Sequence, residues 1–82
     1  MPINIQHKVL REMLKNLPLP AAREILELNL PEREWKAIYY CDCEQRTLIE
    51  VGYELGCEES QVKKIRRSAY EKLAFTYFKD KP

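Results

Sequence analysis

Residues 47–73, which read TLIEVGYELGCEESQVKKIRRSAYEKL, decide the fold. Thr47 followed three residues later by Glu50 is typical of a capping box, so a helix is predicted to begin after Thr47. Gly56 is expected to end that helix, because glycine readily adopts the left-handed conformation of a helix C-terminus. A second helix is predicted from about Glu59 to Tyr77. The stretch therefore predicts two helices joined by a tight turn.

The spacing of small and apolar residues indicates how these two helices pack. Gly52 lies in the middle of the first helix, where glycine costs about 1 kcal/mol relative to alanine. We expect a second helix to cross closely above it, which only a small residue would allow. The inward positions of this helix-turn-helix are Val51, Gly52, Leu55, Gly56, Val62 and Ile65. A plain helical hairpin with a solvated basic helix is the alternative interpretation.

The outward face of the second helix is rich in groups that bind DNA. We expect Lys63, Lys64 and Arg67 to contact phosphates or guanine edges in a major groove. Ser60 and Gln61 are expected to bond bases or backbone, and Arg66 and Lys72, further round the helix, to reach flanking phosphates.

Two carboxylates, Glu58 and Glu59, stand at the start of this same helix. A carboxylate there repels phosphate, although it can accept a hydrogen bond from a cytosine amine. Both residues equally suit the positive end of the helix dipole. The sequence leaves these two interpretations open.

The net charge hides an uneven distribution. The 82 residues hold 14 basic and 13 acidic side chains, a total that argues against a strongly basic nucleic-acid-binding protein. Residues 23–59, however, carry four basic and ten acidic side chains, whereas residues 60–82 carry seven basic and two acidic. The basic end coincides with the predicted DNA-facing helix, and the acidic middle is interpreted as mostly a solvated face.

The rest of the chain predicts an all-α fold. Apolar spacing and prolines indicate helices at about 5–16, 20–28 and 31–40, with a loop at 41–46. Ile5, Val9 and Leu28 are among the residues expected to be buried. Residues 1–28 are predicted to form an N-terminal helical segment of two short helices, and residues 29–82 a helix-turn-helix domain.

Other classes of site find little support. Cys41, Cys43 and Cys57 lack the usual spacing of a zinc site, and their odd number without a secretory signal favours a reducing cytoplasm. His7 is interpreted as a surface residue, because no catalytic set accompanies it. We therefore expect no enzyme activity, cofactor or metal, and no membrane span, since no apolar run approaches about 20 residues.

Three segments together resemble region four of bacterial sigma factors, over about residues 28–74. They are Leu30-Pro31-Glu32-Arg33-Glu34, the run from Arg46 to Gly56, and the run from Gln61 to Arg67 followed by Ala69 and Lys72-Leu73. The resemblance implies a domain that reads the −35 promoter element and packs on the flap of RNA polymerase. The sequence departs from that family at Glu59, where an arginine is usual, and it has no room for the upstream sigma domains. It looks like a stand-alone regulator of the kind that phages and prophages encode.

Two functional hypotheses follow. The first is a cytoplasmic transcriptional regulator of a bacterial host cell that binds double-stranded DNA. The second is a protein-interaction module of the same fold that binds RNA polymerase or another host protein without reading DNA. In addition, the C-terminal aromatic residues Tyr70, Phe75, Tyr77 and Phe78 could form a homodimer surface.

Overall fold

The computed structural model describes residues 5–78, which contain helices and no strand. The elements are α1 (Ile5–Lys15), α2 (Leu19–Asn29), α3 (Glu32–Ile38), the π-helical turn η1 (Tyr39–Cys43), α4 (Leu48–Leu55) and α5 (Glu59–Phe78). The all-α class with a C-terminal helix-turn-helix is confirmed. Within the described residues, no helix has the length and apolar character needed to cross a membrane.

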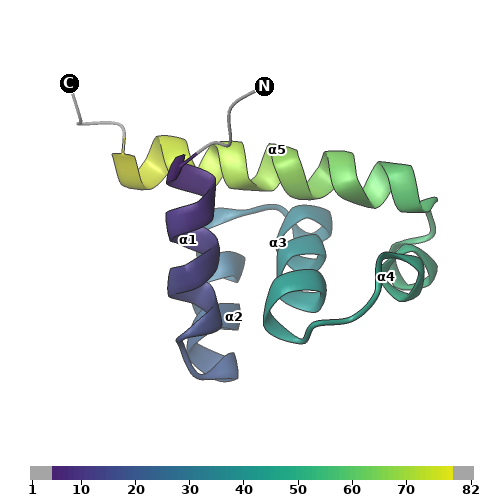
Figure 1. The fold of residues 1–82 in the computed structure, drawn as a ribbon, viewed down its shortest axis with the longest axis horizontal. Coiled ribbons are helices and arrows are strands. Elements are labelled where there is room, and N and C mark those ends of the chain that lie inside the picture. The colour runs from purple at the N-terminus through teal and green to yellow at the C-terminus, as the bar shows by residue number, and fades with distance from the viewer. Residues whose placement is uncertain (1–4, 79–82) are drawn as a thin grey trace.

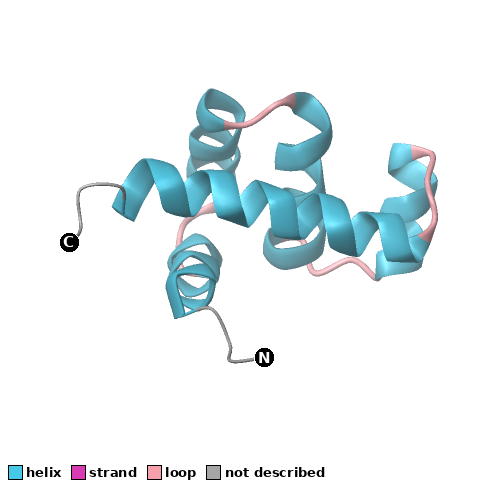
Figure 2. Cartoon of the chain, turned by 90° about the horizontal axis from the view of Figure 1, so that it is seen from above, coloured by secondary structure: helices cyan, strands magenta, loops and turns pink. Residues whose placement is uncertain are grey.

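The long helix α5 organises the molecule. Figure 1 shows it running along one side, with α1 and α3 crossing beneath it and α4 under its N-terminal end. Seen from above in Figure 2, α5 runs lengthwise over the other helices, with α1 to one side of it. Contacts join α5 directly to α1, α3 and α4. The position of α5 is therefore set by packing along most of its length.

The main hydrophobic core draws on both halves of the chain. Leu10, Leu26, Ile38 and Tyr70 are almost fully buried in it and come from α1, α2, α3 and α5. Burying such side chains contributes about 1.5–3 kcal/mol each. Helices on both sides of residue 28 thus share one core, while the division into two domains at that residue stays a prediction.

Some apolar residues predicted to be buried are instead exposed. Ile5 and Val9 are 71% and 49% exposed, and Leu28 is 78% exposed. The reason in α1 is that only Leu10 and Leu14 are buried, while His7 and Arg11 of the same helix contact Tyr70, so Ile5 and Val9 lie outside the contact with α5. The apolar stripe of α1 is therefore wider than the area in which α1 contacts its neighbouring helices.

The predicted loop at residues 41–46 is wrong for its first three residues. The helix that begins at Glu32 continues through Cys43, because its last turn widens into the π-helical η1. The amide of Glu44 closes this turn by donating to the carbonyl of Tyr39 at 2.9 Å. Cys41 and Asp42, expected in a loop, are buried as a result.

Candidate nucleic-acid interface

The helix α4 begins as its sequence predicts. The Thr47 hydroxyl accepts a hydrogen bond from the Glu50 amide at 3.2 Å, and the Glu50 carboxylate accepts one from the Thr47 amide at 3.0 Å. The capping box is therefore confirmed. It satisfies backbone donors that a helix N-terminus otherwise leaves without partners.

The turn after α4 requires both glycines, one of them for a reason that the sequence did not indicate. Gly56 has a φ of 70°, in the left-handed region, and its amide donates to the carbonyl of Gly52. A Cβ at Gly52 would lie 2.6 Å from the carbonyl oxygen of Cys57. The crowding thus comes from the turn's own backbone, and the expectation of a helix crossing above Gly52 was wrong.

A small second core holds α4 against the start of α5. Val51 and Val62 are fully buried there, and Leu55 and Cys57 pack against them while remaining partly exposed. Ile65 is also only partly buried. Since Val62 lies in the first turn of α5, its burial turns the opposite side of that helix toward solvent.

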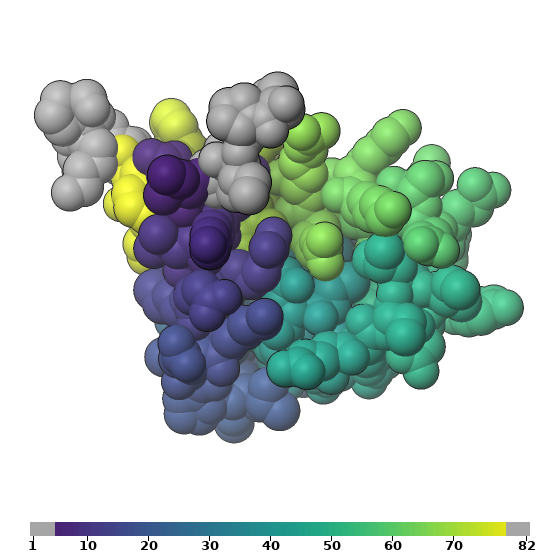
Figure 3. Space-filling model, in the orientation of Figure 1, coloured from purple at the N-terminus to yellow at the C-terminus, as the bar shows by residue number. Residues whose placement is uncertain are grey.

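The exposed side of the first half of α5 is a cationic surface. Ser60, Gln61, Lys63, Lys64 and Arg67 are all exposed there. A shallow depression of about 270 Å³ is lined by Lys63, Lys64, Arg66 and Arg67. Figure 3 shows this part of α5, in green, at the surface and clear of the purple N-terminal helix. Four cations around one depression repel one another, and an anion placed there would relieve that repulsion.

Two of the seven residues predicted to contact DNA are engaged within the protein. Arg66 forms a partly buried ion pair with Asp42 at 3.4 Å, and Lys72 donates to Glu34 at 2.9 Å. The ion pair of Lys72 lies at the surface, where such pairs contribute about 0–1 kcal/mol. A DNA contact by either residue stays a prediction.

The buried carboxylate of Asp42 was not predictable as a functional group from the sequence. It accepts hydrogen bonds from the Tyr70 hydroxyl and from Arg66, which lie one turn apart on α5. Burial, with Asp42 beside it, raises the pKa of Tyr70 well above its usual range. The spacing of four between Arg66 and Tyr70 is the only local signal that could have indicated a shared partner.

His7, predicted to be a surface residue, also contacts α5. Its ring stacks on the ring of Tyr70 with centroids 5.7 Å apart, and it is only partly exposed. Desolvation lowers the pKa of His7; the charge of Glu71 opposes this shift, and the charges of Arg11 and Arg67 add to it. The first turn of α1 therefore lies close to the cationic surface of α5.

The two glutamates lie at the start of α5, both exposed. The backbone carbonyl of Glu58 accepts from the amides of Gln61 and Val62, so Glu58 immediately precedes the helix. Glu59 occupies its first turn. Both therefore stand where a carboxylate complements the helix dipole, next to the cationic surface.

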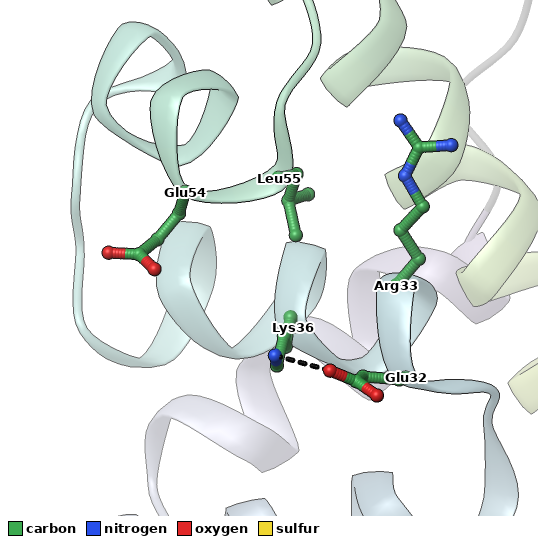
Figure 4. Close-up of a pocket in the computed structure, with 5 residues that line it drawn as sticks. All are labelled: Glu32, Arg33, Lys36, Glu54 and Leu55. Carbon is green, nitrogen blue, oxygen red and sulfur yellow. Dashed lines mark hydrogen bonds and ion pairs between the residues drawn. The ribbon is translucent and has the colours of Figure 1, made fainter.

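A second hollow lies between α3 and α4. It measures about 350 Å³ and is lined by Glu32, Arg33, Lys36, Glu54 and Leu55. Figure 4 shows Lys36 and Glu32 joined by a hydrogen bond, which measures 2.6 Å and lowers the pKa of Glu32. Its mixed charges distinguish this hollow, which we call the α3–α4 groove, from the purely cationic depression on α5.

The three cysteine thiols form no metal-binding cluster within residues 5–78. All three cysteines are free, and burial raises the pKa of Cys43 to about 11. Among residues 5–78, no three potential metal ligands come together.

Of the C-terminal aromatic residues, Tyr70 belongs to the core, whereas Phe75 and Tyr77 are exposed. A dimer surface formed by these aromatics stays a prediction.

Comparison with known proteins gives one match. The family model described as Sigma-70, region 4 matches residues 28–74, more than half of the chain, and this range includes all of α3, η1 and α4 and most of α5. No curated protein and no solved structure matches the chain.

Proposed function

Because the chain belongs to the sigma-70 region 4 family, we propose that it is a transcriptional regulator that binds promoter DNA through the first half of α5. Domains of this family are non-catalytic helix-turn-helix modules that bind promoter DNA. What the proposal adds is the regulatory role and the residues that carry out the binding.

The cationic depression on α5 is the observation that carries this proposal. Lys63, Lys64 and Arg67 project from the helix that follows the turn, which is the helix that enters the major groove in helix-turn-helix proteins. Their charges attract phosphates, and Arg67 has the planar guanidinium that can bond a guanine edge with two donors. Ser60 and Gln61 lie one turn earlier and would add hydrogen bonds to bases or backbone.

The charge distribution supports the same surface. Apart from Glu58 and Glu59 at the start of α5, the acidic residues of the middle of the chain lie on other elements, such as Glu27 on α2 and Glu54 on α4. DNA that approaches α5 therefore meets the positive side of a nearly neutral molecule. Such an arrangement orients the protein on the duplex before any base is read.

The proposal is tested by removing two charges from α5 and two from elsewhere. We expect Lys63→Ala combined with Lys64→Ala to abolish a gel shift of duplex DNA at low salt. Arg33→Ala combined with Lys36→Ala is the matched control, since it removes the same charge from the α3–α4 groove. Equal affinity of the two double variants would contradict the proposal.

A second candidate function is favoured by the α3–α4 groove and its surroundings. Ile49 and Tyr53 are exposed on α4, the helix that also supplies Glu54 and Leu55 to the groove. Exposed apolar side chains close together are typical of protein contacts. We propose RNA polymerase as the partner on this side. Co-elution of the purified polymerase with the chain, in the absence of DNA, would support it. Loss of co-elution in Arg33→Glu, with DNA binding retained, would assign the contact to the groove.

The remaining predictions are independent of this proposal. Phage or prophage origin, a homodimer and a cytoplasmic location all stay predictions. DNA binding by α5 requires none of them.

A further inference from the structure

One face of α5 changes from exposed to buried along its length. Lys63, Arg67, Tyr70 and Ala74 are spaced by four, three and four residues, so they follow one another along the same side of the helix. Lys63 and Arg67 are exposed, whereas Tyr70 and Ala74 are only 1% and 7% exposed. Something therefore covers the far half of the face that carries the DNA-binding cations.

One covering element is α1; the other is η1, whose Asp42 accepts a hydrogen bond from Tyr70. The ring of His7 stacks on Tyr70, and the guanidinium of Arg11 lies over the same ring, 5.6 Å from its centroid. Figures 1 and 2 both show α1 next to the C-terminal half of α5, toward the end away from α4. The helix α1 thus stands where the exposed cationic stripe of α5 ends.

One flank of α1 is itself basic. Lys8, Arg11 and Lys15 are spaced by three and four residues, which places them on one side of the helix. Arg11 lies over Tyr70 of α5 and so fixes the direction of this flank toward α5, while Lys8 and Lys15 are exposed. The single acid of α1, Glu12, lies four residues after Lys8 and three before Lys15, so this flank carries three cations and one acid.

We propose that α1 is a second DNA-contacting element, whose Lys8 and Lys15 bind phosphates flanking the segment that α5 reads. This inference rests on the proposed function. DNA that extends from Lys63 and Arg67 along α5 would meet α1, on whose flank the cations outnumber the single acid, Glu12. Two helical turns, about 10 Å, separate Lys8 from Lys15, so the two lysines would reach different phosphates.

The dependence of DNA affinity on salt tests this inference, because each phosphate contact contributes about 0.9 to the slope of log K against log salt. Binding of the whole chain to a fluorescent duplex is measured between about 50 and 200 mM salt. We expect Lys8→Ala combined with Lys15→Ala to make the slope less steep by about one to two. Arg33→Ala combined with Lys36→Ala, which removes the same net charge, should leave the slope unchanged.

The outcomes separate this inference from the proposed function. An unchanged slope in the Lys8 and Lys15 variant, with a reduced slope in the Lys63 and Lys64 variant, would overturn the role of α1 alone. Absence of salt-dependent binding in the unmodified chain would overturn both. Both lysines are exposed, so a urea midpoint close to that of the unmodified chain is expected to show that the variant is folded.

Discussion

The Tyr70 hydroxyl donates a hydrogen bond to the Asp42 carboxylate, and these two residues are 28 positions apart in the chain. Asp42 belongs to η1 and Tyr70 to the middle of α5. Arg66, one turn earlier on α5, reaches the same carboxylate. The contact therefore fixes where α5 lies on α3 and η1, and so how its cationic surface is presented.

Removing the Tyr70 hydroxyl should destabilise the protein measurably. In Tyr70→Phe the buried carboxylate loses one donor, which costs about 1–3 kcal/mol of unfolding free energy. Urea denaturation measures this difference. Tyr77→Phe is the control, because Tyr77 is exposed, and its change should stay within about 0.5 kcal/mol. Equal stability of the two variants would show that the bond to Asp42 contributes nothing.

Gly52→Ala should destabilise the protein, although alanine forms helices better than glycine does. An exposed mid-helix glycine replaced by alanine normally gains about 1 kcal/mol. Here the new Cβ would lie 2.6 Å from the carbonyl oxygen of Cys57, which must move and carry the turn with it. We expect a loss of about 1–3 kcal/mol in urea denaturation. A gain in stability would contradict the close approach at this turn.

Gly56→Ala should also destabilise the protein, for a different reason. Its site has space, since nothing lies within 4 Å of an added Cβ, but the φ of 70° is unfavourable for any side chain. The expected loss is about 1–2 kcal/mol. Asparagine tolerates this conformation better, so Gly56→Asn should lose less than Gly56→Ala in the same measurement. The reverse order would argue against conformational strain as the cause.

Stability should fall as the pH drops below the ordinary His7 pKa of 6.5. The folded state lowers this pKa, so between the folded and unfolded values the unfolded chain binds more protons. The contribution of His7 is therefore complete above pH 6.5 and is lost as the pH falls toward its folded value. Urea midpoints at about pH 7.5 and pH 5.5 should differ less in His7→Gln than in the unmodified chain. An identical difference would exclude His7 as the source.

Replacing the two glutamates at the start of α5 should raise DNA affinity, whereas replacing the lysines of α5 should lower it. Glu58→Gln combined with Glu59→Gln removes negative charge beside the cationic surface, and affinity for a random-sequence duplex should rise at low salt. The same change weakens the interaction with the helix dipole, so stability should fall by a few tenths of a kcal/mol to about 1 kcal/mol. Weaker DNA binding by the double variant would instead indicate that the carboxylates accept hydrogen bonds from the DNA.

The helix-turn-helix was predictable from sequence because its signals are local. Thr47 and Glu50 lie within one turn, and Gly56 marks the end of the same short helix. The buried Asp42 was not predictable, since its partners are 24 and 28 residues away and the π-helical turn that places it has no simple pattern. The partial burial of His7 and the exposure of Val9 likewise depend on which side of α1 meets α5.

Mapping of backbone amide shifts by NMR while duplex DNA is added tests the central claim most directly, because it locates the bound surface without any substitution. The account predicts that the largest changes fall on residues 58–67, around Lys63, Lys64 and Arg67. Changes confined to the α3–α4 groove, or no change at low salt, would contradict it.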